Sequence, residues 1–147
     1  MSRLTPAEVE AYLQEPHVAV LSVSRAGRGP VAVPIWYEFA DGRLWMITLP
    51  DSVHGRIMQR TGRATLTVRS EEYGETRTRE RYVMAEGPIE ITSDDIEPLV
   101  RRIRRRYYAG AQAEQWVNRP LDSFTLSQKV VVLQPETLSG YEWVEQL

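Results

Sequence analysis

The chain has 147 residues, enough for one domain of ordinary size, and its formal net charge of −2 gives no sign of a nucleic-acid partner. It contains no cysteine, which excludes disulfides, cysteine-ligated zinc, iron–sulfur clusters and thiol nucleophiles. It shows neither an apolar signal core near the N-terminus nor a run of the roughly 20 apolar residues that span a bilayer. We therefore expect a single cytoplasmic domain over residues 1–147, with no membrane contact.

The N-terminal third predicts one helix followed by three strands. Thr5, Pro6 and Glu8 form the signature of a capped helix start, and Pro16 is expected to end that helix. Apolar alternation and β-branched residues then predict strands over residues 17–25, 30–40 and 43–49, with a hairpin turn at Asp41-Gly42. We expect these three strands to form a meander.

The remainder of the chain alternates between strands and short helices. A short helix is predicted over residues 52–61 and a longer one over 94–108, with a further helical piece at 111–116. Strands are predicted over residues 63–69, 79–91, 129–133 and 138–144, with a polar loop at 70–78 and a bend at Gly87-Pro88. This order predicts a mainly β (α+β) fold, an antiparallel barrel of six to seven strands with flanking helices.

Residues 52–63 read Ser-Val-His-Gly-Arg-Ile-Met-Gln-Arg-Thr-Gly-Arg and carry a family resemblance. They resemble a segment of the pyridoxamine 5'-phosphate oxidase-like superfamily, especially its actinobacterial flavin/deazaflavin oxidoreductase branch. That segment usually reads Thr/Ser-Val-Lys-Gly-Arg-Asn-Leu, two basic residues, then Asp-Pro-Arg. Pro34-Ile35-Trp36-Tyr37 is similar to the family's Pro-Val-Trp-Phe strand, and Glu86-Gly87 to its Val-Glu-Gly strand. The resemblance implies an FMN-binding split barrel that dimerises and holds two cofactors at the dimer interface.

The resemblance also implies where the cofactor lies. Its phosphate would lie at residues 52–56, where a helix start offers free backbone N–H groups, and its ring would lie along residues 34–36. His54 stands where the family usually has lysine, so the charge at this position is only partial near neutral pH. The candidate cofactor-binding residues are Pro34, Ile35, Trp36, Thr48, Ser52, Val53, His54, Gly55 and Arg56. No catalytic side chain and no metal site is predicted.

The resemblance implies an oxidoreductase that transfers a hydride from the reduced deazaflavin coenzyme F-420 to a small organic substrate. Two alternatives stay open: an FMN-dependent oxidase or reductase on the same fold, and a non-catalytic flavin- or haem-binding protein. His17 is interpreted as structural. Loops 70–78 and 109–128 are expected to shape the substrate pocket. Residues 138–147 lack an extended basic tail, which argues against pyridoxamine-phosphate oxidation itself.

Two surface features carry further expectations. The homodimer that the resemblance implies is supported in sequence by apolar and aromatic residues at Ile35, Trp36, Trp45 and Trp143. A dense basic run has two readings, a solvated helix face or an electropositive rim for an anionic ligand such as a cofactor tail. That run consists of Arg101, Arg102, Arg104, Arg105 and Arg106.

Overall fold

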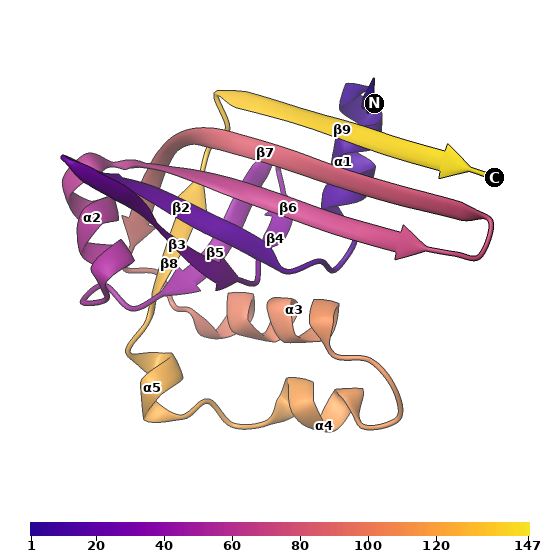
Figure 1. Cartoon of the computed structure of the whole chain (residues 1–147). Helices are drawn as coiled ribbons and strands as arrows, with labels where there is room; N and C mark the ends of the chain where they lie inside the picture. Colours follow the sequence, from indigo (N-terminus) through magenta and orange to yellow (C-terminus); the bar gives the residue numbers. More distant parts are fainter.

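The computed structural model describes all of residues 1–147. Its elements are β1 (Ser2–Arg3), α1 (Pro6–Leu13), β2 (Ala19–Arg25), β3 (Arg28–Ile35), β4 (Glu38–Ala40), β5 (Arg43–Thr48), α2 (Val53–Thr61), β6 (Arg63–Tyr73), β7 (Arg77–Thr92), α3 (Glu97–Tyr107), α4 (Ala113–Asn118), α5 (Ser123–Leu126), β8 (Lys129–Leu133) and β9 (Thr137–Gln146). Helices α3 to α5 form a layer below the sheet, and α2 lies at one end (Figure 1). No helix is long and apolar enough to cross a membrane.

The strands form one antiparallel sheet that curls into an open barrel. Its order is β3-β2-β6-β7-β8-β5-β4, with β9 paired to β7 and β1 paired to β9. Because β3 and β4 end this path, the barrel is split between them, as predicted. The bend predicted at Gly87-Pro88 lies where β7 passes from its pairing with β9 to its pairing with β8. A Cβ on Gly87 would lie 2.1 Å from the carbonyl oxygen of Gln134, so only glycine fits this crossing.

Residues 30–40 are extended as predicted, but they form two strands and not one, and the predicted three-strand meander is wrong. The chain breaks at Trp36-Tyr37, so that β3 pairs with β2 whereas β4 pairs with β5 on the other side of the split. Tyr37 and Phe39 are nevertheless buried in the same interior, which the side chain of Ile35 also packs against. The alternation of inward- and outward-facing side chains therefore continues through the break. For this reason the sequence pattern does not reveal that the strand partner changes there.

The polar loop predicted over residues 70–78 is also wrong, because β6 and β7 extend through it as a hairpin that projects beyond the barrel (Figure 1). Polar side chains at the base of this hairpin form ion pairs with β9 and with the turn after α1. Arg79 contacts Glu142 at 2.6 Å, and Arg81 contacts Glu15 at 2.9 Å. Strand β1 and helix α5 were not predicted, since both are too short to show a hydrophobic period.

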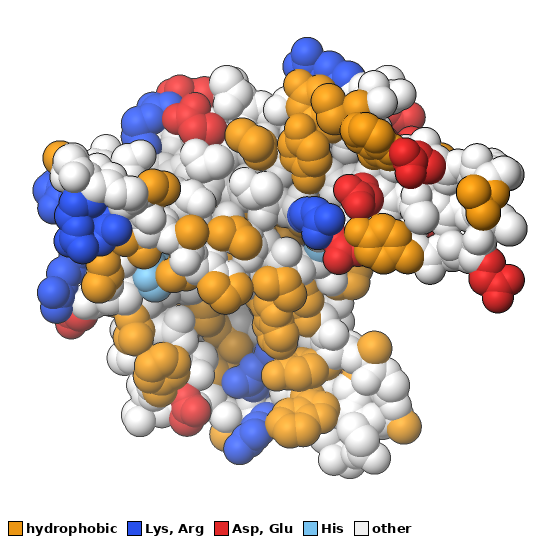
Figure 2. Space-filling model, viewed as in Figure 1, with side chains coloured by type: hydrophobic (Ala, Val, Ile, Leu, Met, Phe, Trp, Pro, Cys, Tyr) orange, Lys and Arg blue, Asp and Glu red, His pale blue; other side chains and the backbone are white.

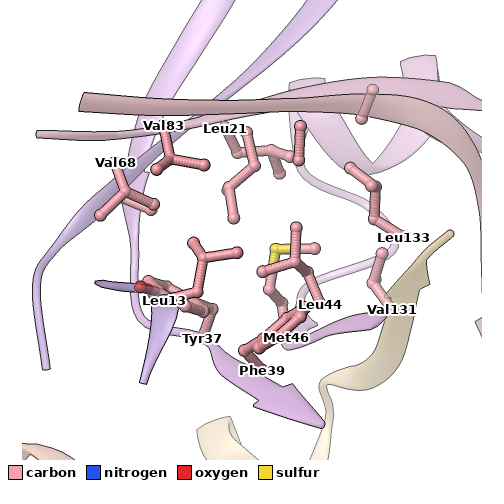
Figure 3. Packing of buried hydrophobic residues seen from close by; sticks show 14 of the residues in the cluster. Leu13, Leu21, Tyr37, Phe39, Leu44, Met46, Val68, Val83, Val131 and Leu133 are labelled. Atoms are coloured by element: carbon pink, nitrogen blue, oxygen red, sulfur yellow. The ribbon is translucent and has the colours of Figure 1, made fainter. Parts of the chain in front are cut away.

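Two apolar clusters lie on opposite faces of the β5–β8 part of the sheet. The larger fills the barrel, where side chains from α1 and from both halves of the sheet point toward one another (Figure 3). The smaller joins α3 to the outer face of β8 and is completed by Trp45. Trp45 also donates its indole N–H to the carbonyl of Ala40, so it is a packing residue of this fold.

The arginine run on α3 is occupied within the chain. Arg106 donates to the three carbonyls of residues 13–15, at 2.6 to 2.9 Å, and so caps the C-terminal end of α1. Arg101 and Arg104 each donate to the carbonyl of Arg119 at 2.7 Å, just after α4. The other two pair with carboxylates, Arg102 with Glu38 and Arg105 with Glu114. The run therefore ties α3 to neighbouring elements of the same chain, which favours the reading of a structural helix face.

Candidate functional site

A cleft of about 540 Å³ opens along β3, the strand at which the barrel is split. Hydrophobic side chains border a hollow between the sheet and the helical layer, and basic side chains gather near α2 (Figure 2). No Asp, Glu, Lys or Arg lines the cleft. Its lining residues are Val18, Val33, Pro34, Ile35, Trp36, Ile47, Thr48, Leu49, Ser52, His54, Ile103, Phe124 and Gln128.

The polar end of the cleft is built where β5 leads into α2. Ser52 is the N-cap of α2: its hydroxyl accepts from the N–H of Gly55 at 3.0 Å and donates to the carbonyl of Leu49 at 2.7 Å. Thr48 is 3% exposed, and its Oγ1 lies 2.6 Å from Nε2 of His54. Burial lowers the pKa of His54 from its ordinary value. Near pH 7 the imidazole therefore carries less charge than an exposed histidine would.

The start of α2 can accept an anion. The N–H groups of Val53 and His54 are the first in the helix and have no acceptor within it. Arg56 is exposed and takes part in none of the ion pairs of the chain. A Cβ on Gly55 would lie 2.3 Å from the carbonyl oxygen of Leu49, so glycine lets α2 begin directly against the end of β5. These donors fit the phosphate of a cofactor whose ring lies in the apolar cleft.

The aromatic wall of the cleft is held in place from behind. The ring of Trp36 stacks on Tyr107, with centroids 4.6 Å apart and an interplanar angle of 8°. The Tyr107 hydroxyl donates to the carbonyl of His17 at 2.7 Å. Trp36 therefore presents a fixed flat surface, suited to a planar ligand. The His17 imidazole lies away from the cleft, 5.0 Å from the Tyr12 ring centroid, consistent with a structural residue.

The structure brings together six of the nine candidate residues as cleft lining, namely Pro34, Ile35, Trp36, Thr48, Ser52 and His54. Val53, Gly55 and Arg56 do not line the cleft but lie on the adjoining first turn of α2. The lining residues that sequence reasoning did not name singly are Val18, Val33, Ile47 and Leu49 on the sheet side and Ile103, Phe124 and Gln128 on the helical side. Of the two loops expected to shape a pocket, 109–128 supplies Phe124 and Gln128, whereas 70–78 supplies no lining residue.

Chemically, the cleft is a binding site without an acid–base constellation of its own. Its lining is apolar apart from the hydroxyl and imidazole groups of Thr48, Ser52 and His54 at the α2 end and the amide of Gln128, the residue before β8. Such a site can bury a flat ring system, orient it by one polar end and exclude water from its face. Reactivity would then have to come from the bound group.

Solved structures with the same fold cover nearly the whole chain. A FAD-binding protein from Mesorhizobium loti matches with a TM-score of 0.69 at 19% identity, covering 97% of each chain. The FAD- and haem-binding protein of Mycobacterium smegmatis matches with a TM-score of 0.71 at 18% identity, covering 97% of this chain and 82% of the other. An F-420 reductase matches with a TM-score of 0.65 at 15% identity, covering 91% and 98%. No curated protein sequence matches the chain.

At the level of sequence, residues 5–138 match the profile of the pyridoxamine 5'-phosphate oxidase family, which takes in every element from α1 to the start of β9. The resemblance drawn from residues 52–63 is thereby confirmed over most of the chain. The cleft at the split of the barrel and the phosphate-sized donor set at α2 lie within the matched region. This chain belongs to the pyridoxamine 5'-phosphate oxidase family.

Proposed function

We propose that this protein is an oxidoreductase that holds a flavin-type cofactor in the cleft beside β3, and that this cofactor is the deazaflavin coenzyme F-420. When bound in reduced form, the cofactor supplies a hydride to a small organic substrate. The protein supplies binding, orientation and a water-poor environment. The observation that carries the proposal is the cleft itself, uncharged along the ring-sized part and provided with anion donors at its α2 end.

Each part of the lining has a role in this proposal. Trp36 and the apolar residues of β3 would cover the ring, while the N–H groups of Val53 and His54 and the guanidinium of Arg56 would hold the phosphate. The likeness to an F-420 reductase supports the deazaflavin, and the likeness to FAD-binding proteins keeps flavins as the alternative.

Parallel titrations of cofactor-free protein with F-420, FMN and FAD, followed by cofactor fluorescence, test the proposal. Micromolar or tighter binding of F-420, together with substrate reduction by the reduced coenzyme, is the expected result. Selective binding of FMN or FAD would move the protein to the flavin branch. Tight binding without turnover with any electron donor would make it a carrier, and failure to bind any of the three would overturn the proposal.

The affinity for a phosphate-bearing cofactor should depend on the protonation of His54. Because burial lowers the pKa of the free imidazole whereas a bound phosphate favours the imidazolium, binding takes up a proton. Affinity should therefore rise as pH falls from 8 toward 6. The phosphate of FMN, a monoester, also titrates near pH 6, so for FMN the comparison is with His54→Gln, in which only the phosphate contribution remains. If the affinities of the wild type and of His54→Gln change equally with pH, His54 does not have this role.

We further propose that the protein works as a homodimer. Strand pairing places Pro34, Val20, Thr67, Met84 and Ser139 side by side on the outer face of the sheet, which is uncharged along this row. Val20 and Met84 are 40% and 43% exposed, and Pro34 also lines the cleft. A second copy on this row would therefore border the cofactor site. Light scattering at micromolar concentration should give twice the mass of one chain; a monomer would contradict the proposal.

A further inference from the structure

The chain contains a single lysine. Lys129 is the only lysine among its 18 lysine and arginine residues, and it is the first residue of β8. Its side chain is exposed, and none of the ion pairs or side-chain hydrogen bonds of the chain includes its ammonium group. In a protein whose basic residues are otherwise all arginine, the position of this one flexible ammonium group calls for an explanation.

The strand register places Lys129 beside the polar end of the cleft. It pairs directly with Thr48 across β5 and β8. Met46 and Val131, which pair two residues further along the same strands, point into the barrel core. Because every second residue of a strand points to the same side, Thr48 and Lys129 lie on that face of the sheet as well. Directly opposed residues have Cβ atoms about 4.5–5.5 Å apart. The ammonium group therefore extends from a point next to the Thr48 hydroxyl, which in turn contacts His54 at 2.6 Å.

The charges at this end of the cleft leave a bound anion in need of a basic side chain from the protein. In the free protein His54 carries less charge than an exposed histidine would, and Arg56 projects from the exposed side of α2. Asp51, in the loop between β5 and α2, is exposed and is not paired with Lys129. An anion at the start of α2 would consequently meet partial positive charges from backbone N–H groups but no permanent positive charge on the β5 side, except that of Lys129.

We propose that Lys129 is an anion-binding residue of the cofactor site, and that its ammonium group contacts the phosphate held at the start of α2. In this arrangement β8 supplies the permanent positive charge that His54 lacks. The inference rests on the proposed function, because it places the anionic group of the cofactor at this end of the cleft.

Chemical labelling tests the contact, since the chain has one ε-amine. Acetylation of Lys129 by an activated acetate ester is followed by mass spectrometry, with the α-amino group of the same chain as internal reference. Saturating FMN should slow acetylation of Lys129 about tenfold and leave the α-amino group unaffected. Riboflavin, which lacks only the phosphate, should give no protection. Equal protection by both would mean that the ring covers the lysine, and the proposal would fail.

Binding measurements with variants give an independent readout. Lys129→Met should weaken FMN about tenfold or more and change riboflavin binding less than about twofold. Lys129→Arg should retain most of the FMN affinity. In the double variant His54→Lys/Lys129→Met, which moves the charge across to α2, FMN binding should recover. Loss of FMN and riboflavin affinity in equal measure, or no recovery in the double variant, would overturn the assignment.

Inorganic phosphate separates failure of this inference from failure of the proposed function. If the wild-type protein binds none of the three cofactors, the proposed function is wrong. Protection of Lys129 by millimolar phosphate would then still support an anion site beside Thr48. Absence of that protection would overturn the inference as well.

Discussion

Replacing Gly55 with alanine is expected to destabilise the protein by about 2–3 kcal/mol and to abolish tight cofactor binding. The added Cβ would lie 2.3 Å from the carbonyl oxygen of Leu49 and 2.8 Å from that of Pro50. Both contacts are with backbone, which cannot rotate away as a side chain would. The usual gain of about 1 kcal/mol for alanine over glycine within a helix is too small to offset them. Helix α2 must therefore shift away from β5, and its first turn with it.

Urea unfolding and the F-420 and FMN titrations measure the two parts of this prediction. Gly29→Ala is the matched control, because a Cβ at Gly29 meets nothing within 4 Å and the backbone there needs no positive φ. The control should unfold within about 0.5 kcal/mol of wild type and bind normally. A stability of Gly55→Ala equal to that of the control would show that α2 can move without cost, and our account of its first turn would be wrong.

The second large effect is expected for Arg106→Met, which should cost about 2–4 kcal/mol and lower the melting temperature by roughly 5–10 °C. The guanidinium makes three charged hydrogen bonds to the carbonyls of residues 13–15 and lies 4.7 Å from the centroid of the Tyr37 ring. Methionine fills similar space but leaves these carbonyls without their donor. Because Tyr37 adjoins Trp36, loosening this contact should also widen the aromatic wall of the cleft.

Arg105→Met provides the control in the same turn of α3. Its only ion pair, with Glu114, is between side chains that are both more than half exposed, and such pairs contribute about 0–1 kcal/mol. Thermal unfolding of the two variants side by side isolates the capping role of Arg106. Equal melting temperatures would mean that the carbonyls at the end of α1 are satisfied as well by water.

Features that depend on neighbouring residues were predictable from the sequence. The capping box of Thr5 and Glu8 forms as expected, and Asp41-Gly42 turns the chain with positive φ at both residues. The helix over residues 52–61 begins at its Ser52 cap and ends at Gly62 in the left-handed region. In each case the information lies within one turn of the chain.

Features that depend on distant partners were not predictable. Residues 70–78 resembled a loop because they are polar. Nothing local indicates that they extend a hairpin at whose base Arg79 meets Glu142 and Arg81 meets Glu15. Likewise, the arginine run gave no hint that the carbonyl partners of Arg106 lie more than ninety residues away. The cleft shows the same division: its α2 end was found from a local motif, whereas Phe124 and Gln128 reach it through tertiary packing.

Strand β9 has a consequence for how the protein is made. It pairs with β7 from Glu86↔Thr137 to Arg77↔Gln146, and β1, at the beginning of the chain, pairs with β9 in turn. During synthesis, β7 therefore leaves the ribosome with one edge unpaired, and β1 waits for a partner that is translated after all the other strands of the sheet. Open strand edges recruit other chains. We expect nascent chains to depend on chaperones until residue 146 has emerged, because the β7–β9 pairing is incomplete before then.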